Sequence, residues 1–210
     1  MNYKTQTFKL KKMKKIILSI AFIAGAFIAN SAKAQTSSWA VDKSHASVKF
    51  TVEHMMVSET EGNFKVFDGT ISSKNDDFTD AQVDFTVDVA SINTGDDKRD
   101  GHLKSDDFFN AEKFPKMTFK GTSFKKVDGK KYVLEGDLTI RDITKKVKFD
   151  VVYNGTGKNP WGMTVAGFKA TSKINRVDYK LMWNKTLEAG GVLVGEDVNI
   201  NVNLEFVKGK

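Results

Sequence analysis

Hydrophobic and polar residues alternate through most of the chain from residue 38 onward, and this pattern predicts β-strands. In residues 44–54 (SHASVKFTVEH) the apolar residues Val48, Phe50 and Val52 share one parity. The same period of two recurs near residues 83–89, 132–140, 147–153, 166–174 and 198–206. Such a period gives each strand one apolar and one polar face. We therefore predict an all-β protein with about eight antiparallel strands.

Turn signals separate these runs. Asp68-Gly69, Asp128-Gly129 and Asn154-Gly155 are dipeptides typical of tight hairpin turns. The two prolines, Pro115 and Pro160, lie outside the alternating runs. This placement is expected because proline cannot donate a hydrogen bond within a sheet.

One segment departs from the period of two. Residues 94–114 (TGDDKRDGHLKSDDFFNAEKF) combine many charges with Leu103, Phe108 and Phe109, and a proline follows. This composition predicts short helical turns with one apolar side. We expect the segment to act as a plug or lid on the strands.

Strands with one apolar face can form a two-sheet sandwich or close into a barrel. Many inward positions are phenylalanine, which suits either a packed core or an apolar tunnel. Taken alone, apolar alternation favours the packed core, because such patterns more often mark a core than a ligand site.

The first 34 residues have the features of a secretory signal peptide. Five lysines between residues 9 and 15 precede the apolar run 16–29, and Ala32 and Ala34 form an A-x-A cleavage pattern. The run is shorter than the ~18 residues that a membrane-spanning helix needs. We predict a signal peptide at 1–34 and one mature domain at 35–210, which is periplasmic or secreted and soluble after cleavage.

Charge argues against several partners. The chain has 33 Lys and Arg against 26 Asp and Glu, but seven of the lysines lie in residues 1–34, which contain no acid. The mature domain therefore has no net charge, which disfavours nucleic acids and anionic membranes as partners. The chain also contains no cysteine, so the exported domain relies on its core rather than on disulfides.

Six segments in order resemble the YceI-like family of exported polyisoprenoid-binding proteins, over residues 38–207. They are WAVDKSHASVKFTVEH, GNFKVFDGTI, SINTGDDKRDGHLKSDDFFNAEKFPKMTFKGTSF, LEGDLTIRDITKKVKFDV, FKATSKINRVDY and VGEDVNINVNLEF. The resemblance implies an extended, eight-stranded, lipocalin-like barrel. Its lumen would hold an isoprenoid quinone tail or a polyprenyl lipid, for carriage, storage or presentation, without a further cofactor.

On this interpretation the inward positions form the lipid-binding lumen. The predicted lumen residues are Val48, Phe50, Val52, His54, Phe64, Phe85, Val87, Phe108, Leu138, Ile140, Phe149, Val151, Phe168, Ile200 and Val202.

Three residues are candidates for contact with a ligand head group: His54, Arg141 and Arg176. His54 follows the apolar row of its strand, where a ring with polar tips suits the border. A bond from His54 to a backbone carbonyl in the next loop is the structural alternative. For the two arginines, in TIRDITK and INRVDY, the alternative is a salt bridge or a turn lock between strands.

Catalysis and metal binding have little support in the sequence. Ser44 and His45 are neighbours on an expected strand and so point to opposite faces, and no G-x-S-x-G, H-x-H or H-E-x-x-H motif is present. We expect a binding protein rather than an enzyme, and no metal site. The alternatives are a hydrolase or isomerase acting on a bound lipid, or a packed barrel that acts through its outer surface.

Residues 185–196 (KTLEAGGVLVGE) leave two interpretations open. The stretch contains three glycines together with Leu187, Val192, Leu193 and Val194. It could form a lip for transient membrane contact, or it could be a hairpin loop. Pairing of two barrels into a homodimer is a further expectation that the family resemblance raises.

Overall fold

The computed structural model describes residues 35–188 and 190–209, and these form one compact unit. The predicted signal peptide, residues 1–34, lies outside the described residues. None of the helices in the described part of the chain is long and apolar enough to cross a membrane. The strands are β1 (Ser37–Val41), β2 (Ser47–His54), β3 (Ser58–Phe64), β4 (Phe67–Ser73), β5 (Gln82–Asp88), β6 (Ile92–Asn93), β7 (Lys116–Asp128), β8 (Lys131–Ile140), β9 (Ile143–Lys158), β10 (Thr164–Asn175) and β11 (Val194–Lys208). The helices are α2 (Asp97–Lys104) and the short 3-10 helices η1 (Lys43–His45), η2 (Val89–Ser91) and η3 (Arg176–Tyr179).

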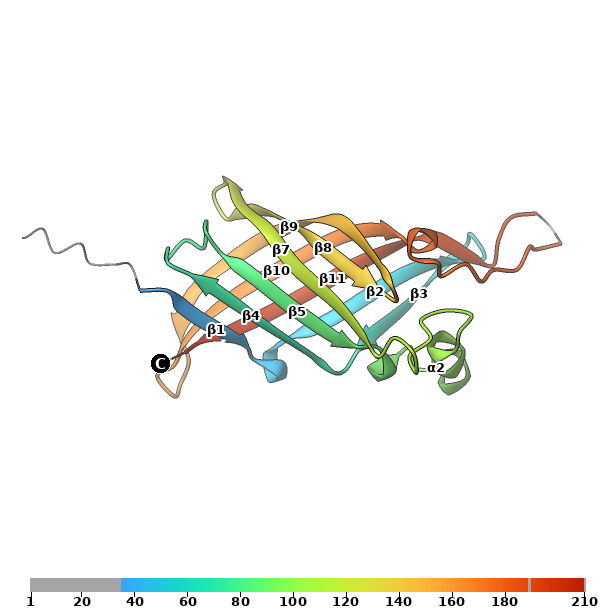
Figure 1. Cartoon of the computed structure of the whole chain (residues 1–210), viewed down its shortest axis with the longest axis horizontal. Coiled ribbons are helices and arrows are strands. Elements are labelled where there is room, and N and C mark those ends of the chain that lie inside the picture. The colour runs from blue at the N-terminus through green and yellow to red at the C-terminus, as the bar shows by residue number, and fades with distance from the viewer. Residues whose placement is uncertain (1–34, 189, 210) are drawn as a thin grey trace, which may run out of the picture. The chain divides into compact units, whose positions relative to one another are not determined.

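The strands close into an antiparallel barrel (Figure 1). Strand β11 pairs with β10 along one side, and on its other side with β2 and then β1. Strand β4 pairs with β1 and with β5, and β3 pairs with β2 and with β6. Three pairs of consecutive strands therefore each occupy one strand position of the barrel: β1 with β2, β3 with β4, and β5 with β6. Counted in this way the barrel has eight strands, as the sequence predicted.

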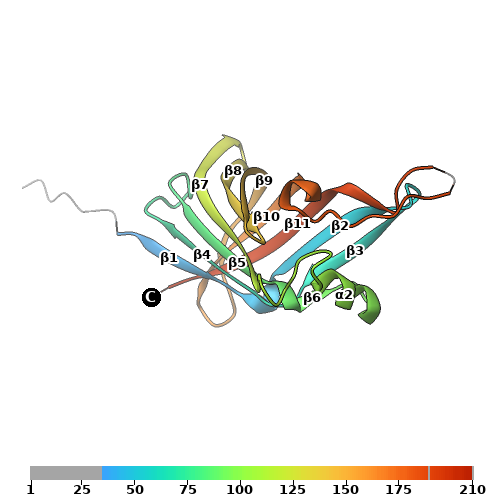
Figure 2. The ribbon, with the colours of Figure 1, turned by 45° about the vertical axis from the view of Figure 1, so that its right-hand side comes forward.

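The prediction of short helical turns within residues 94–114 is confirmed by helix α2. Helix α2 begins at Asp97, where the Asp96 carboxylate accepts hydrogen bonds from the backbone N–H groups of Lys98 and Arg99, both at 2.9 Å. This N-cap lies two residues after Thr94, which instead donates its N–H to the buried Asp100 carboxylate at 2.8 Å. The helix and residues 105–114 connect β6 to β7 beside β3 (Figure 2).

One half of the barrel interior is filled by aromatic rings, which we call the aromatic plug. Phe168 is central: its ring lies 5.2 Å from that of Phe78 and 5.1 Å from that of Tyr153. Phe78 enters from the loop between β4 and β5, and the Tyr132 hydroxyl donates to the carbonyl of Asp77 in that loop at 2.9 Å. The plug consists of Trp39, Phe78, Phe124, Tyr132, Tyr153, Phe168 and Phe206.

Two of the three turn predictions are wrong. Asp128-Gly129 does form the turn between β7 and β8, but Asp68-Gly69 lies inside β4 and Asn154-Gly155 lies inside β9. Gly155 has a φ of 121° beside a bulge, where the register between β9 and β10 shifts. Gly69 is needed for another reason: a Cβ atom there would lie less than 3.0 Å from the ring of Phe85.

Candidate functional site

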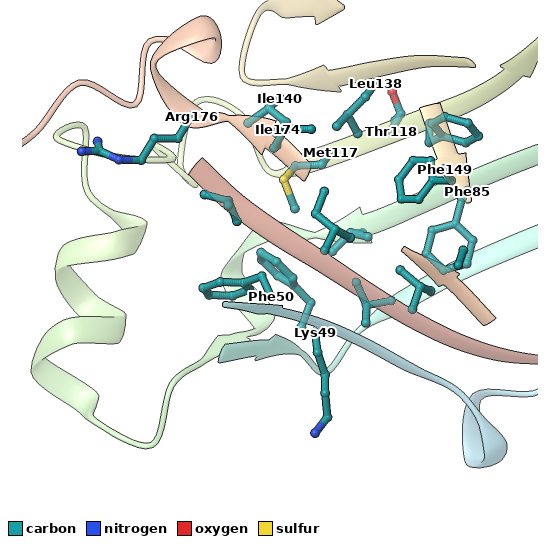
Figure 3. A pocket seen from close by; sticks show the side chains of 18 of the residues that line it. Lys49, Phe50, Phe85, Met117, Thr118, Leu138, Ile140, Phe149, Ile174 and Arg176 are labelled. Carbon is teal, nitrogen blue, oxygen red and sulfur yellow. The ribbon is translucent and has the colours of Figure 1, made fainter. Parts of the chain in front are cut away.

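The other half of the barrel encloses a cavity of about 210 Å³ whose lining is almost entirely apolar (Figure 3). The inward rows of eight strands supply most of its wall, and the rest comes from the lid segment (Leu103, Phe108 and Phe109) and from Arg176 and Leu181. The cavity lies between Arg176 at one end and Phe85 and Phe149 toward the other. The predicted lumen residues that line it are Val48, Phe50, Val52, Phe64, Phe85, Val87, Phe108, Leu138, Ile140, Phe149, Ile200 and Val202.

The structure places the other three predicted lumen residues outside the lining. Phe168 is part of the aromatic plug, and Val151 is buried beside Tyr132 of the same plug, so neither meets the open space. His54 is the last residue of β2, in register with Ser58 and with the lining residue Val194, but it is not itself part of the lining. Strand parity places a side chain inside the barrel, but it does not say how far along the barrel the interior is filled.

Several lining residues were not among the predicted set. The clearest signal overlooked was strand β7, in which Met117 and Phe119 alternate with the exposed Thr118 and Lys120. The lining residues outside the predicted set are Lys49, Val83, Leu103, Phe109, Met117, Thr118, Phe119, Leu134, Ala170, Ile174, Leu181, Val194, Val198 and Leu204, and Arg176, which the sequence suggested only as a head-group contact.

Three of the lining residues are polar, and none points a free polar group into the cavity. Lys49 extends away from it (Figure 3), and its ammonium group lies 2.9 Å from the Glu61 carboxylate. Thr118 belongs to the exposed face of β7. Arg176 contributes to the wall but directs its guanidinium away from the apolar side chains. The cavity therefore suits a hydrocarbon chain.

The Arg176 guanidinium is buried and bonded to backbone carbonyls. Its Nε donates to Gly195 at 2.8 Å, and its Nη2 donates to Val194 at 3.2 Å. Its Nη1 donates to Leu181 and, at 3.0 Å, to Trp183. Burial lowers the pKa of Arg176 from its ordinary value. These bonds join the segment after η3 to the start of β11, which matches the turn-lock alternative.

The Arg141 side chain also bonds to backbone carbonyls of distant segments. It lies in the turn between β8 and β9 with a φ of 56°, and it does not line the cavity. Its Nη1 donates to the carbonyls of Phe108 at 3.0 Å and Lys180 at 3.1 Å, and its guanidinium lies over the Phe114 ring. Arg141 thus connects the lid segment to the residues that follow η3.

Three rings pack together where these segments meet, and we call them the lid cluster: His102, Phe108 and Trp183. Their centroids lie 4.7 Å apart for His102 and Trp183, 5.0 Å for His102 and Phe108, and 5.5 Å for Phe108 and Trp183. The His102 Nε2 lies 2.8 Å from the Asp107 carboxylate. Since Phe108 also lines the cavity, the lid cluster forms the outer support of one cavity wall.

A candidate ligand set for a metal lies outside the cavity lining, at η1. The Asp42 carboxylate lies 3.0 Å from His45 Nδ1, which lies 3.9 Å from the Glu205 carboxylate. Hydrogen bonds from the Ser44 side chain and from His45 lower the pKa of Asp42 to about 2. Asp42 also accepts the Ser44 N–H as the cap of η1. The Asp42 carboxylate therefore has a structural role, as the N-cap of η1 and as a hydrogen-bond partner of His45.

Comparison with known proteins agrees with this architecture. Residues 39–206 match the model of the YceI-like domain. A UPF0312 protein of Staphylococcus aureus is 43% identical over 166 residues, which cover 79% of this chain and 94% of that protein. The crystal structure of a Campylobacter jejuni YCEI protein is similar with a TM-score of 0.64 and 32% identity, over 75% of this chain and 90% of that one.

A more distant structure shares the fold alone. It is a polyisoprenoid binding domain from Saccharophagus degradans, with a TM-score of 0.60 and 14% identity, over 81% of this chain and 98% of that one. The family match spans the strands of the barrel and the lid segment between β6 and β7. The chain belongs to the YceI-like domain family.

Proposed function

We propose that this protein binds the chain of a long isoprenoid lipid, a quinone tail or a polyprenyl lipid, inside the half-barrel cavity. One observation carries the proposal: the interior is filled by aromatic rings in one half and left open in the other, with an apolar lining. A barrel of this size needs no such space for stability, since side chains can fill it. The similar fold of the polyisoprenoid binding domain from Saccharophagus degradans supports the same ligand class.

The affinity would come from burial of hydrocarbon. Each buried CH₂ contributes ~0.8 kcal/mol, so a chain that fills the cavity binds without a charged contact. The polar head would remain near the lid end, where Arg176 and the lid cluster lie. We assign Arg141 and Arg176 to holding the backbone there. His54 stays a candidate for head-group contact, which His54→Ala tests through head-group selectivity.

We further propose that the protein works outside the cytoplasm, in the periplasm or as a secreted protein, as a carrier, store or presenter of its lipid. The signal peptide expected at residues 1–34 motivates this location. An isoprenoid tail is insoluble in water, so a lipid that crosses an aqueous compartment needs a protein to cover it.

Exchange of lipid with a membrane would use the exposed apolar tip near β2 and β3. Met55, Met56 and Val57 form the turn between these strands, and Val57 is 83% exposed. The loop that contains the Thr186–Val192 bridge lies beside this turn, since a Cβ atom on Gly191 would meet the Met56 sulfur. Liposome flotation of Met56→Ser and Val57→Ser variants tests the contact.

Homodimer formation stays a prediction.

The direct test is native mass spectrometry of the mature protein purified from the envelope of its own host, followed by lipid extraction. The proposal expects an isoprenoid to co-purify at one molecule per chain, or to bind on reconstitution. A protein that takes up neither quinone nor polyprenol would contradict it and would favour a function of the outer surface.

A matched pair of variants locates the ligand. Ile200→Asp puts a carboxylate into the lining of β11, and burial of an unpaired charge opposes lipid uptake. Asn203→Asp introduces the same carboxylate at an exposed position of the same strand. We expect only Ile200→Asp to lose the lipid. Uptake by a folded Ile200→Asp variant would place the ligand elsewhere.

We propose binding without catalysis. The titratable pair His102 and Asp107 belongs to the lid cluster rather than to the cavity lining. Incubation with a candidate lipid, followed by mass analysis of the recovered lipid, separates the alternatives: a hydrolase or isomerase would return an altered product.

A further inference from the structure

Three phenylalanines of the cavity wall lie directly over glycines of neighbouring strands. A Cβ atom on Gly62 would come within 3.0 Å of the Phe50 ring, one on Gly69 within 3.0 Å of the Phe85 ring, and one on Gly136 within 3.0 Å of the Phe119 ring. Phe50 and Gly62 are direct partners across β2 and β3, as are Gly69 and Phe85 across β4 and β5. All three rings line the cavity.

This arrangement keeps the rings against the wall. A ring that occupies the place of a missing side chain lies flat over the neighbouring backbone instead of projecting across the barrel. Real Cβ atoms essentially never approach other atoms to less than 3.0 Å, so a methyl group at Gly69 would displace the Phe85 ring. The backbone of the wall blocks an outward movement, and the open cavity lies on the other side. The displaced ring would therefore enter the space that a ligand needs.

Gly69 offers the clearest case of the three. The three atoms nearest to its added Cβ all belong to the Phe85 ring. A Cβ on Gly62 would also meet Thr94, and one on Gly136 would meet the Lys120 carbonyl oxygen, which is backbone. Phe85 lies at the end of the cavity away from Arg176, and it stacks on Phe67 with centroids 5.8 Å apart. A change at Gly69 thus acts on the deep part of the cavity.

We propose that Gly69, by holding the Phe85 ring against the wall, sets how deep a hydrocarbon chain enters the cavity and so which chain lengths the protein prefers. This inference rests on the proposed binding of isoprenoid chains. Gly62 has the corresponding effect nearer the lid, where its partner Phe50 lies between Phe85 and Arg176. The glycines are specificity-determining residues that touch no ligand themselves.

The test uses the mature chain and a series of isoprenoid alcohols: farnesol, geranylgeraniol, solanesol and a longer polyprenol. Gly69→Ala is compared with the wild type and with Gly157→Ala. Gly157 is also a strand glycine, in β9, but a Cβ atom there would meet nothing within 4 Å. Competition among the alcohols, read by native mass spectrometry, gives the preference of each protein.

We expect Gly69→Ala to bind farnesol like the wild type and to bind the longer alcohols more weakly, by on the order of 10³-fold where an isoprene unit is excluded. Gly157→Ala should match the wild type. The double variant Gly69→Ala/Phe85→Val removes the displaced ring and should regain the long alcohols, which separates this effect from misfolding.

Two results would overturn the inference, and they differ. A folded Gly69→Ala variant with the wild-type preference would mean that the ring and glycine only stabilise the sheet, while the proposed lipid binding stands. If the wild type binds none of the alcohols, the proposed function fails, and the inference fails with it.

Discussion

The guanidinium of Arg141 donates a hydrogen bond to the carbonyl oxygen of Phe108 at 3.0 Å, although the two residues belong to different parts of the barrel. The same Nη1 atom donates to the carbonyl of Lys180 at 3.1 Å. Phe108 lines the cavity, and Lys180 follows η3. One side chain in the turn between β8 and β9 therefore positions both segments that cover the lid end.

Arg141→Ala should loosen both segments together. A hydrogen bond from a charged donor contributes roughly 1.5–3 kcal/mol, so we expect a loss of about 2–3 kcal/mol in the free energy of unfolding. Hydrogen exchange should rise across residues 105–114 and 177–183 and stay unchanged in β10. Lys145→Ala is the control, because its ammonium pairs only distantly, at 3.9 Å, with Asp178. An exchange increase limited to the β8–β9 turn would contradict the assignment.

Trp183→Ala should speed the release of a bound chain. Trp183 supports His102 and Phe108 from outside the cavity, so its loss leaves the Phe108 wall with less packing. We expect the dissociation rate to rise by roughly tenfold, from the loss of about 1.4 kcal/mol of support. Stopped-flow displacement of a fluorescent isoprenoid measures this rate. Trp161→Ala, at a tryptophan that is 75% exposed, should leave it unchanged.

Truncation of two phenylalanines should distinguish the filled from the open half. Phe168→Ala removes the centre of the aromatic plug and should cost about 3–5 kcal/mol. Phe50→Ala should cost clearly less, because part of its ring already faces open space and loses fewer contacts. Urea unfolding of the lipid-free proteins gives both values. Equal losses would mean that the cavity half is packed as tightly as the plug.

Acid should destabilise the protein partly through Asp42. The pKa of this carboxylate is lowered from 3.8 to about 2 in the folded state, so its stabilising effect is complete above pH 3.8 and disappears as the pH falls toward 2. Asp42→Asn should reduce this part of the acid dependence. Thermal midpoints of both proteins between neutral pH and pH 2 test the prediction, which fails if the two curves stay parallel.

His45 gives the opposite pH dependence. Its hydrogen bond to Asp42 raises the pKa of His45 above 6.5. The stabilisation is therefore complete below pH 6.5, and it is lost as the pH rises through the folded-state pKa. Asp42→Asn should remove this part as well, since the partner loses its charge.

Alternation along the chain was sufficient to predict the strands and most inward positions, whereas the choice of a barrel over a sandwich rested on the family resemblance. The parity of Phe50, Phe85 and Phe149 places each on the inner face, because side chains alternate strictly along a strand. The same parity holds for Phe168, which fills the interior instead of lining a space. Whether an inward ring faces a void depends on rings from other strands and from the β4–β5 loop, and these contacts are not encoded in any local pattern.

The glycines show a second limit. Asp68-Gly69 has the composition of a hairpin turn, yet it lies inside β4, where Gly69 is directly across the ladder from Phe85. A turn glycine is selected for its backbone freedom, whereas this one is selected for the absence of a side chain. Only the cross-strand register distinguishes the two. The roles of Arg141 and Arg176 also depend on tertiary contacts, because carbonyl groups that they bond to lie on distant segments.

The division of the barrel into a filled and an open half has a consequence for how such proteins can diversify. A ring in the aromatic plug is expected to contribute more to the folding free energy than a ring that faces the open space, while the cargo would be selected by the residues around that space. Substitutions in the open half can therefore accumulate without crossing the stability threshold that purges most core changes. A lineage could exchange one hydrophobic cargo for another while its barrel continued to fold.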